Sequence, residues 1–522
     1  MTTTRRSLLA AGAGLMVPTG VFAAPRSVVA RTTYGPVRGT REGETLVFKG
    51  VRYGADTSPR RFRPPVPPRP WTRPLDATAY GAASPQSGSD EGPQGEDCLF
   101  LNVWTPALRD GVKRPVMVYI HGGAYSGGSG SSPLYDGTRL SRRGDVVVVT
   151  LNHRLNVFGY GFLARLVGPD FADSGNVGML DLVLALQWVR DNIAAFGGDP
   201  GRVMLFGQSG GGAKIATLMA MPQAKGLFHT AATMSGQQVT ASGPLHATDR
   251  MKLFLAAVGL SPDRAGQAAT LPAQKLIEGL SVADPFTPGR LYFGPVLDGR
   301  TLTRHPFYPD ASPLGLSVPM IIGNTHDETR AFLAHSKPDP FAMSWDEVAA
   351  RIAPEMRVDI DPDLVVATYR RLYPSYTPTE VFFAATTAGR SWRGAVIEAE
   401  ERAKAGAPAW TYQLDLPTTI EGGRLRAMHT ADIVLAFDNL AAEGSPTAPS
   451  AAAHAVADRL SEAFIALART GDPTHPGLPA WPKYELERRS TMVFDAETRV
   501  VDDPRGEERR LFATVPYIQP GT

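Results

Sequence analysis

The sequence predicts an α/β protein with a mostly parallel central sheet and helices on both faces. Residues 115–120, 145–151 and 203–206 are short apolar runs, as expected for strands covered on both faces, and 145–151 is rich in β-branched residues. Between the last two runs, residues 180–196 carry apolar side chains at helical spacing. Apolar strands that alternate with helices in this way favour a parallel sheet.

Flanking segments extend this pattern in both directions. We expect a hairpin at 37–51, strands at 96–104, 318–322 and 409–414, and a long helix at 451–469.

A basic, proline-rich stretch at 60–71 predicts a polyproline segment that wraps the surface. We expect Phe62 and Trp71 to anchor it, in preference to an SH3-type ligand.

The first 23 residues predict a twin-arginine export signal. Arg5 and Arg6 precede a mildly apolar, Gly- and Ala-rich run to Val17, and residues 21–23 offer a small-residue cleavage site. The alternative is an arginine pair that precedes a buried helix. We expect a periplasmic or secreted protein with no stable membrane span, and a single catalytic domain over residues 24–522.

Composition excludes several classes of function. The chain has 53 Lys and Arg against 51 Asp and Glu, so no strong positive field favours nucleic acid. Its ten histidines form no H-E-x-x-H motif and no Cys/His cluster, so a zinc site has little support. We expect no metal and no organic cofactor. The single cysteine, Cys98, excludes an intrachain disulfide. The expected partner is a small-molecule substrate, and the expected state is a monomer or weak homo-oligomer.

The apolar run at 203–206 leads directly into Gly207-Gln-Ser-Gly-Gly211, which fits a nucleophile elbow. In such an elbow Ser209 stands on a strained turn between a strand and a helix, here expected at 213–221. Strand and helix come so close that Gly207 and Gly211 must lack side chains. The alternative is a glycine-rich loop with an incidental serine.

A second glycine-rich loop, His121-Gly-Gly-Ala124, follows the strand at 115–120. Small residues there let backbone N–H groups approach a substrate oxygen. We expect an oxyanion hole formed by the N–H groups of Gly123, Ala124 and Gly210. The alternative for this loop is a plain glycine turn.

Together these motifs resemble the type-B carboxylesterases, the α/β-hydrolase family that includes bacterial para-nitrobenzyl esterases and cholinesterases. The similarity covers nearly all of 35–500 and rests on the segments 48–53, 96–102, 121–124, 196–200 and 207–211. The resemblance implies an α/β-hydrolase fold with large loop and cap insertions. It also implies a serine hydrolase that cleaves carboxylic esters through an acyl-enzyme.

The resemblance supplies the partners of Ser209. Glu328 matches the family's acid in the G-x-N-x-x-E segment 323–328, where Asp327 is a local rival, and His429 matches the family's base. The order Ser, acid, His is that of α/β-hydrolases. The catalytic triad is therefore expected to be Ser209, Glu328 and His429.

Gly122, Gln208 and Ser235 are expected to support the site, and Ser235 matches a family serine that hydrogen-bonds the acid. His121 is expected to support the oxyanion loop.

Four departures from the family pattern carry information. Gln208 stands where a glutamate is common, so we expect no preference for choline esters. Gly210 replaces a common alanine, and His153 replaces a common tyrosine. Cys98 lacks the partner of the family's usual disulfide and is expected to be a buried thiol.

Other functions remain open: a lipase, an amidase, an esterase of polyacid esters such as fumonisins, or a non-catalytic cholinesterase-like binding domain.

Overall fold

The computed structural model describes residues 28–88, 92–286, 289–519 and 521. The predicted export signal at 1–23 lies outside these residues.

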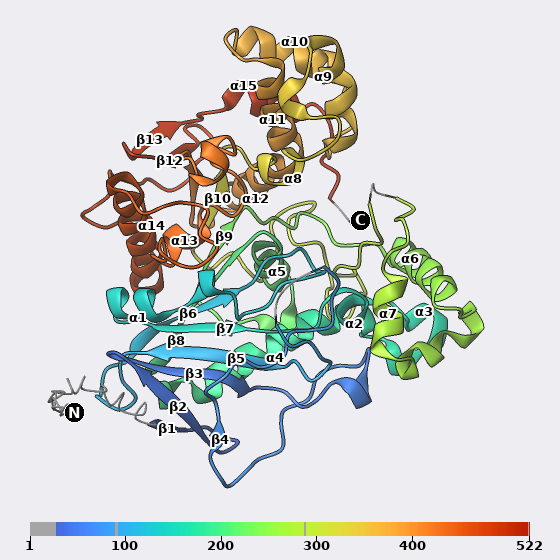
Figure 1. Cartoon of the computed structure of the whole chain (residues 1–522), viewed down its shortest axis with the longest axis vertical. Coiled ribbons are helices and arrows are strands. Elements are labelled where there is room, and N and C mark those ends of the chain that lie inside the picture. Colours follow the sequence, from blue (N-terminus) through green and yellow to red (C-terminus); the bar gives the residue numbers. More distant parts are fainter. Residues whose placement is uncertain (1–27, 89–91, 287–288, 520, 522) are drawn as a thin grey trace, which may run out of the picture.

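A 13-stranded sheet forms the centre of the structure (Figure 1), in the order β1-β2-β3-β5-β7-β6-β8-β9-β10-β11-β12-β13, with β4 beside β2. Neighbouring strands are parallel from β7 to β12. The strand pairs at both ends of the sheet are mostly antiparallel. The strands are Val28–Arg31 (β1), Pro36–Glu42 (β2), Thr45–Arg52 (β3), Leu75–Asp76 (β4), Phe100–Thr105 (β5), Arg114–Ile120 (β6), Val147–Leu151 (β7), Gly198–Gln208 (β8), Thr230–Met234 (β9), Met320–Thr325 (β10), Ala409–Leu414 (β11), Ser490–Phe494 (β12) and Arg499–Asp502 (β13).

Fifteen α-helices are present in the described part of the chain. They are Thr138–Gly144 (α1), Asn156–Tyr160 (α2), Ala164–Val167 (α3), Val177–Asn192 (α4), Gly210–Leu218 (α5), Pro244–Ala257 (α6), Ala273–Gly279 (α7), Arg330–Leu333 (α8), Trp345–Ile352 (α9), Pro362–Leu372 (α10), Pro378–Thr387 (α11), Arg393–Lys404 (α12), Ile433–Ala436 (α13), Ala451–Thr470 (α14) and Gly506–Phe512 (α15). Within the described ranges, none of them is long and apolar enough to cross a membrane.

Alternation along the central strands creates two hydrophobic cores. In β6, Val116 and Val118 pack with residues of α4 and α5 on one face of the sheet. Met117 and Tyr119 pack with residues of α14 on the other face. Both faces are therefore covered, which explains why the strand reads as a continuous apolar run.

A third, smaller core belongs to a cap formed by α8–α11 and α15, at the top of Figure 1. Its apolar residues pack among themselves rather than against the sheet. This cap is one of the large insertions that the resemblance implies.

The structure confirms the predicted elements around the sheet. The proline-rich stretch 60–71 is anchored by Phe62, which is fully buried, and by Trp71, whose Nε1 donates to the Pro36 carbonyl at 2.8 Å. Cys98 is a buried free thiol, and burial raises its pKa well above the usual value.

Candidate active site

The sharp turn at Ser209 joins β8 directly to α5. Ser209 has φ 56° and ψ −126°, a strained conformation for a residue with a side chain. A Cβ at Gly211 would lie 1.9 Å from the Ile120 carbonyl oxygen, so only glycine fits there. The strand–turn–helix predicted from the motif is therefore present, and it presents the Ser209 side chain to a cavity.

Glu328 and His429 meet although 101 residues separate them. Each follows one of two adjacent parallel strands, β10 and β11, whose carboxyl ends lie at the same edge of the sheet. His429 Nδ1 contacts Glu328 Oε2 in a short hydrogen bond, and both side chains are buried. The Glu328 carboxylate also accepts the Thr325 N–H at 2.9 Å and the Asn324 Nδ2 at 3.2 Å.

Asp327, the local rival of Glu328, has different partners. Its carboxylate accepts Arg330 Nε at 3.2 Å and pairs with His326 Nδ1 at 3.0 Å. It thus lies in a neighbouring charge network, and Glu328 is the acid that contacts His429.

Glu328 is poised to remain ionised. Burial alone raises the pKa of its carboxyl, but the adjacent His429 and the hydrogen bonds to it together hold that pKa below the usual value. Ser235 also lowers the pKa of Glu328, although its buried Oγ does not reach hydrogen-bond geometry with any described residue.

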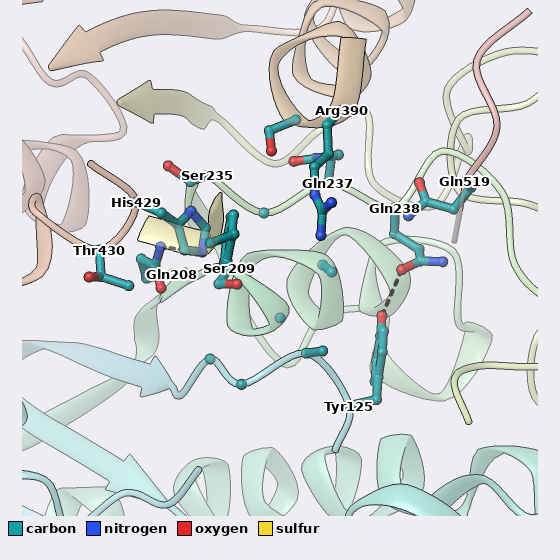
Figure 2. A pocket seen from close by; sticks show the side chains of 18 of the residues that line it. Tyr125, Gln208, Ser209, Ser235, Gln237, Gln238, Arg390, His429, Thr430 and Gln519 are labelled. Atoms are coloured by element: carbon teal, nitrogen blue, oxygen red, sulfur yellow. Dashed lines mark hydrogen bonds between the residues drawn. The ribbon is translucent and has the colours of Figure 1, made fainter. Parts of the chain in front are cut away.

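A contact that the sequence did not predict occupies the other ring nitrogen of His429. The Gln208 side-chain Nε2 lies 3.1 Å from His429 Nε2 (Figure 2). Because the ionised Glu328 accepts a hydrogen from Nδ1, Nε2 is an acceptor and the Gln208 amide donates to it. No hydrogen bond joins the Ser209 hydroxyl to another described residue. Figure 2 shows the imidazole beside Gln208 and Ser209.

The loop after β6 brings unpaired amides to the same cavity. Gly123 and Ala124 have φ values of 79° and 51°, which turn the loop sharply over α5. The N–H groups of Gly123, Ala124 and Gly210 donate to no other group in the described part of the chain, and all three residues line the cavity. A Cβ at Gly210 would lie 2.1 Å from the Ala124 carbonyl oxygen, so the loop and the elbow are in close contact. Gly122 lies beside Gln208, where an added Cβ would be 2.9 Å from its carbonyl oxygen.

A buried basic cluster supports this loop from below. Lys214 of α5 is completely buried and donates from Nζ to the His121 carbonyl at 3.1 Å. The ring of His121 stacks on that of His153 with centroids 4.9 Å apart. Burial, with the nearby Lys214 charge, lowers the pKa of His121 to about 3, and burial lowers that of Lys214 to about 7. Sequence reasoning assigned His121 to the loop but did not identify Lys214.

The cavity holds about 490 Å³ and combines an apolar wall with a polar one. Tyr135, Phe332 and Ile433 contribute apolar surface. Arg357 and Arg390 are its two guanidinium groups, and no carboxylate side chain is among its described lining residues. No sequence motif marks these two arginines.

Three comparisons place this geometry among known proteins. Residues 26–512 match the model of the carboxylesterase family. The chain is 35% identical to the para-nitrobenzyl esterase of Bacillus subtilis (strain 168), over 92% of this chain and 98% of that protein. It is 34% identical to the phenmedipham hydrolase of Pseudarthrobacter oxydans, over 90% of this chain and 95% of that protein. Its structure resembles that of carboxylesterase EST55 from Geobacillus stearothermophilus, with a TM-score of 0.83 and 37% identity over 93% of this chain and 99% of that one.

Proposed function

This chain belongs to the carboxylesterase family and is a carboxylic ester hydrolase, and we propose that Ser209, His429 and Glu328 are its catalytic triad. The observation that carries this assignment is the short Glu328–His429 contact beside the Ser209 turn, at the edge of one cavity. The name of the relative para-nitrobenzyl esterase suggests that small esters with an aromatic group fit this site.

In the proposed reaction, the Gln208 amide swings away from His429 Nε2 as substrate enters. His429 then takes the proton of the Ser209 hydroxyl while Ser209 Oγ attacks the ester carbonyl carbon. Glu328 holds the Nδ1–H tautomer and offsets the positive charge of the imidazolium. His429 returns the proton to the leaving alkoxide, the alcohol departs, and a water activated by His429 hydrolyses the acyl-enzyme.

We assign the oxyanion hole to the backbone N–H groups of Gly123, Ala124 and Gly210. Unpaired amides on the cavity wall support this assignment, because they need not break an internal hydrogen bond to receive a substrate oxygen. The first turn of α5 adds a favourable dipole for the developing charge.

The test combines covalent labelling with substitution. An organophosphate should add one phosphoryl group at Ser209, located by mass spectrometry of the proteolysed protein. Ser209→Ala should abolish labelling and lower kcat by ~10⁴-fold or more with unchanged folding. Ser281→Ala, which changes an exposed serine that does not line the cavity, is the matched control. Label on another residue, or more than a tenth of the activity left in Ser209→Ala, would refute the assignment.

We also propose that residues 1–23 direct export through the twin-arginine route, as Arg5 and Arg6 indicate. Replacing both arginines with lysine should retain the protein in the cytoplasm of a bacterial host, as fractionation and immunoblotting would report. Unchanged periplasmic delivery of that variant would contradict the proposal.

A further inference from the structure

Two arginines from separate segments meet at the polar wall of the cavity. Arg390 lies in a π-helical turn, Ala388–Trp392, between α11 and α12, and Arg357 lies in the loop after α9. The Arg357 N–H donates to the Gly389 carbonyl at 3.1 Å, and Arg357 Nη1 approaches the Arg390 carbonyl at 3.4 Å. Figure 2 shows the Arg390 side chain extending from its helical turn into the cavity beside Gln237. Single π-helical turns are frequent at functional sites.

The charges of these arginines are only partly compensated. Arg390 Nη1 pairs with Glu355 Oε2 at 2.6 Å, whereas Arg357 forms no ion pair with any residue that the structure describes. Burial and the neighbouring Arg357 charge lower the pKa of Arg390, which reflects two like charges held close in a partly dehydrated place. With no carboxylate on the described cavity wall, one positive charge at this wall lacks a counter-charge.

Neutral polar groups surround the arginines. Gln237 is 7% exposed, and its amide oxygen has no hydrogen-bond partner within the described structure. Ser391 and Gln519 also line this side of the cavity. Such a wall is a poor match for an alkyl chain, because a buried polar group left unpaired costs free energy.

Resting on the proposed function, we infer that the natural ester carries a free carboxylate, bound by Arg357 and Arg390 while Ser209 attacks the ester group. A guanidinium binds a carboxylate through paired, charge-assisted hydrogen bonds, which gives both affinity and orientation. The substrate class is therefore an acidic half-ester. Its carboxylate would lie beside Arg390, which Figure 2 shows on the side of the cavity away from Thr430.

The Arg390 side chain also contributes to packing, whereas the main structural contacts of Arg357 are made by its backbone, so Arg357 is the better residue to replace. Arg390 pairs with Glu355 and lies over the Phe332 ring at 5.3 Å, so its loss also affects packing. The contacts of Arg357 that tie the cap to the C-terminal segment are made by its backbone, whose carbonyl accepts the Ile518 N–H at 2.8 Å. Arg357→Gln therefore removes the charge and the weak contact of Nη1 with the Arg390 carbonyl, while leaving the backbone ties in place.

The experiment compares esters that differ in one charge. Mono-p-nitrophenyl succinate, glutarate and adipate carry a carboxylate in the acyl part, and p-nitrophenyl butyrate, valerate and hexanoate are their neutral counterparts. 4-Acetoxybenzoate and its methyl ester make the same comparison for the alcohol part. We expect at least one acidic ester to exceed its neutral counterpart in kcat/KM by ~10- to 100-fold, the range of a charge-assisted contact. Raising the salt concentration should reduce this ratio.

Arg357→Gln should lower the ratio by ~10-fold or more, chiefly through KM of the acidic ester. Arg390→Lys, which keeps the charge but not the paired geometry, should lower it less. Arg371→Gln, which removes an exposed arginine of the cap outside the cavity, is the control and should leave the ratio unchanged.

A binding measurement keeps this inference separate from the triad assignment. Monomethyl glutarate should bind the Ser209→Ala protein more tightly than dimethyl glutarate in calorimetry, and adding Arg357→Gln should remove the difference. Hydrolysis of neutral esters with no preference for acidic ones in any series, or equal binding of the two glutarates, would overturn the inference and leave the proposed function intact. Preferential binding of the acidic ligand without Ser209-dependent hydrolysis would support the charged wall and refute the triad.

Discussion

Lys214 is a buried cation without a carboxylate partner in the described structure, and we predict that Lys214→Met stabilises the protein. The ammonium contacts the His121 carbonyl and lies 5.6 Å from the centroid of the Tyr125 ring. Methionine has a similar length and needs no hydration, so it can fill the same space. The substitution thus removes the cost of burying a charge and loses one hydrogen bond.

The magnitude follows from the pKa of Lys214. Burial lowers it from 10.5 to about 7. The unfolded chain therefore binds more protons than the folded one between these values, and wild-type stability rises with pH across this window. Below pH 7 the full penalty applies, on the order of 5 kcal/mol, and by pH 9.5 it falls to about 1 kcal/mol. Subtracting about 1 kcal/mol for the lost hydrogen bond leaves a gain of about 4 kcal/mol at pH 6.

Thermal unfolding at pH 6 and pH 9.5 tests this reasoning. An unfolding entropy of about 2.1 cal/mol/K per residue gives about 1 kcal/mol/K for a chain of this length, so Tm should rise by about 4 °C at pH 6. At pH 9.5 the difference should nearly vanish. We also expect kcat to fall, since Lys214 fixes the carbonyl at the start of the oxyanion loop. A variant that is less stable than wild type at pH 6, or a gain that is equal at both pH values, would refute the reasoning.

Three further predictions concern the proposed reaction centre. Glu328→Gln should lower kcat by about 10³- to 10⁴-fold with little change in KM, because the amide no longer fixes the His429 tautomer, and a loss below tenfold in steady-state assays would contradict this. Gln208→Glu should shift the acid limb of the kcat/KM pH profile upward by about one pH unit, because a carboxylate 3.1 Å from His429 Nε2 favours the protonated ring, whereas Gln208→Ala should not. Gly210→Ala should reduce kcat by about 10²- to 10³-fold, although the family commonly has alanine there, because the new Cβ would displace Ala124 and its amide. Near-normal activity of a folded variant would count against the oxyanion assignment.

Local patterns predicted the central sheet and the turn at Ser209 well, because each depends on a few neighbouring residues. The helix after Ser209 was expected at 213–221 but spans Gly210–Leu218. The helix begins with three glycines, whose low helix propensity argues against a helix start there. The glycine at 211 is required because a Cβ would meet the Ile120 carbonyl oxygen. Strand β9 was not predicted, because its small residues carry little alternation.

Other parts of the cavity depend on contacts between distant segments, which no local pattern encodes. The match of Glu328 and His429 to a family motif suggested their roles, but the Gln208–His429 contact requires knowing how the imidazole is turned. Arg357 and Arg390 meet only because the cap folds back over the cavity. The spacing of residues in the sequence therefore could not predict that these two side chains line the cavity. It also could not predict that the Lys214 ammonium contacts the His121 carbonyl.

The cap has its own hydrophobic core, separate from the two cores that flank the sheet. Arg357 and Arg390 belong to this insertion, whereas the elbow and the imidazole stand on sheet connections. The two parts still touch: Thr329, next to Glu328, donates to the Phe383 carbonyl of α11 at 3.1 Å, and the Phe332 ring of α8 lies 4.7 Å from the His429 ring. Grafting a relative's cap onto this sheet would therefore offer a route to new ester selectivity only if the graft keeps these two contacts.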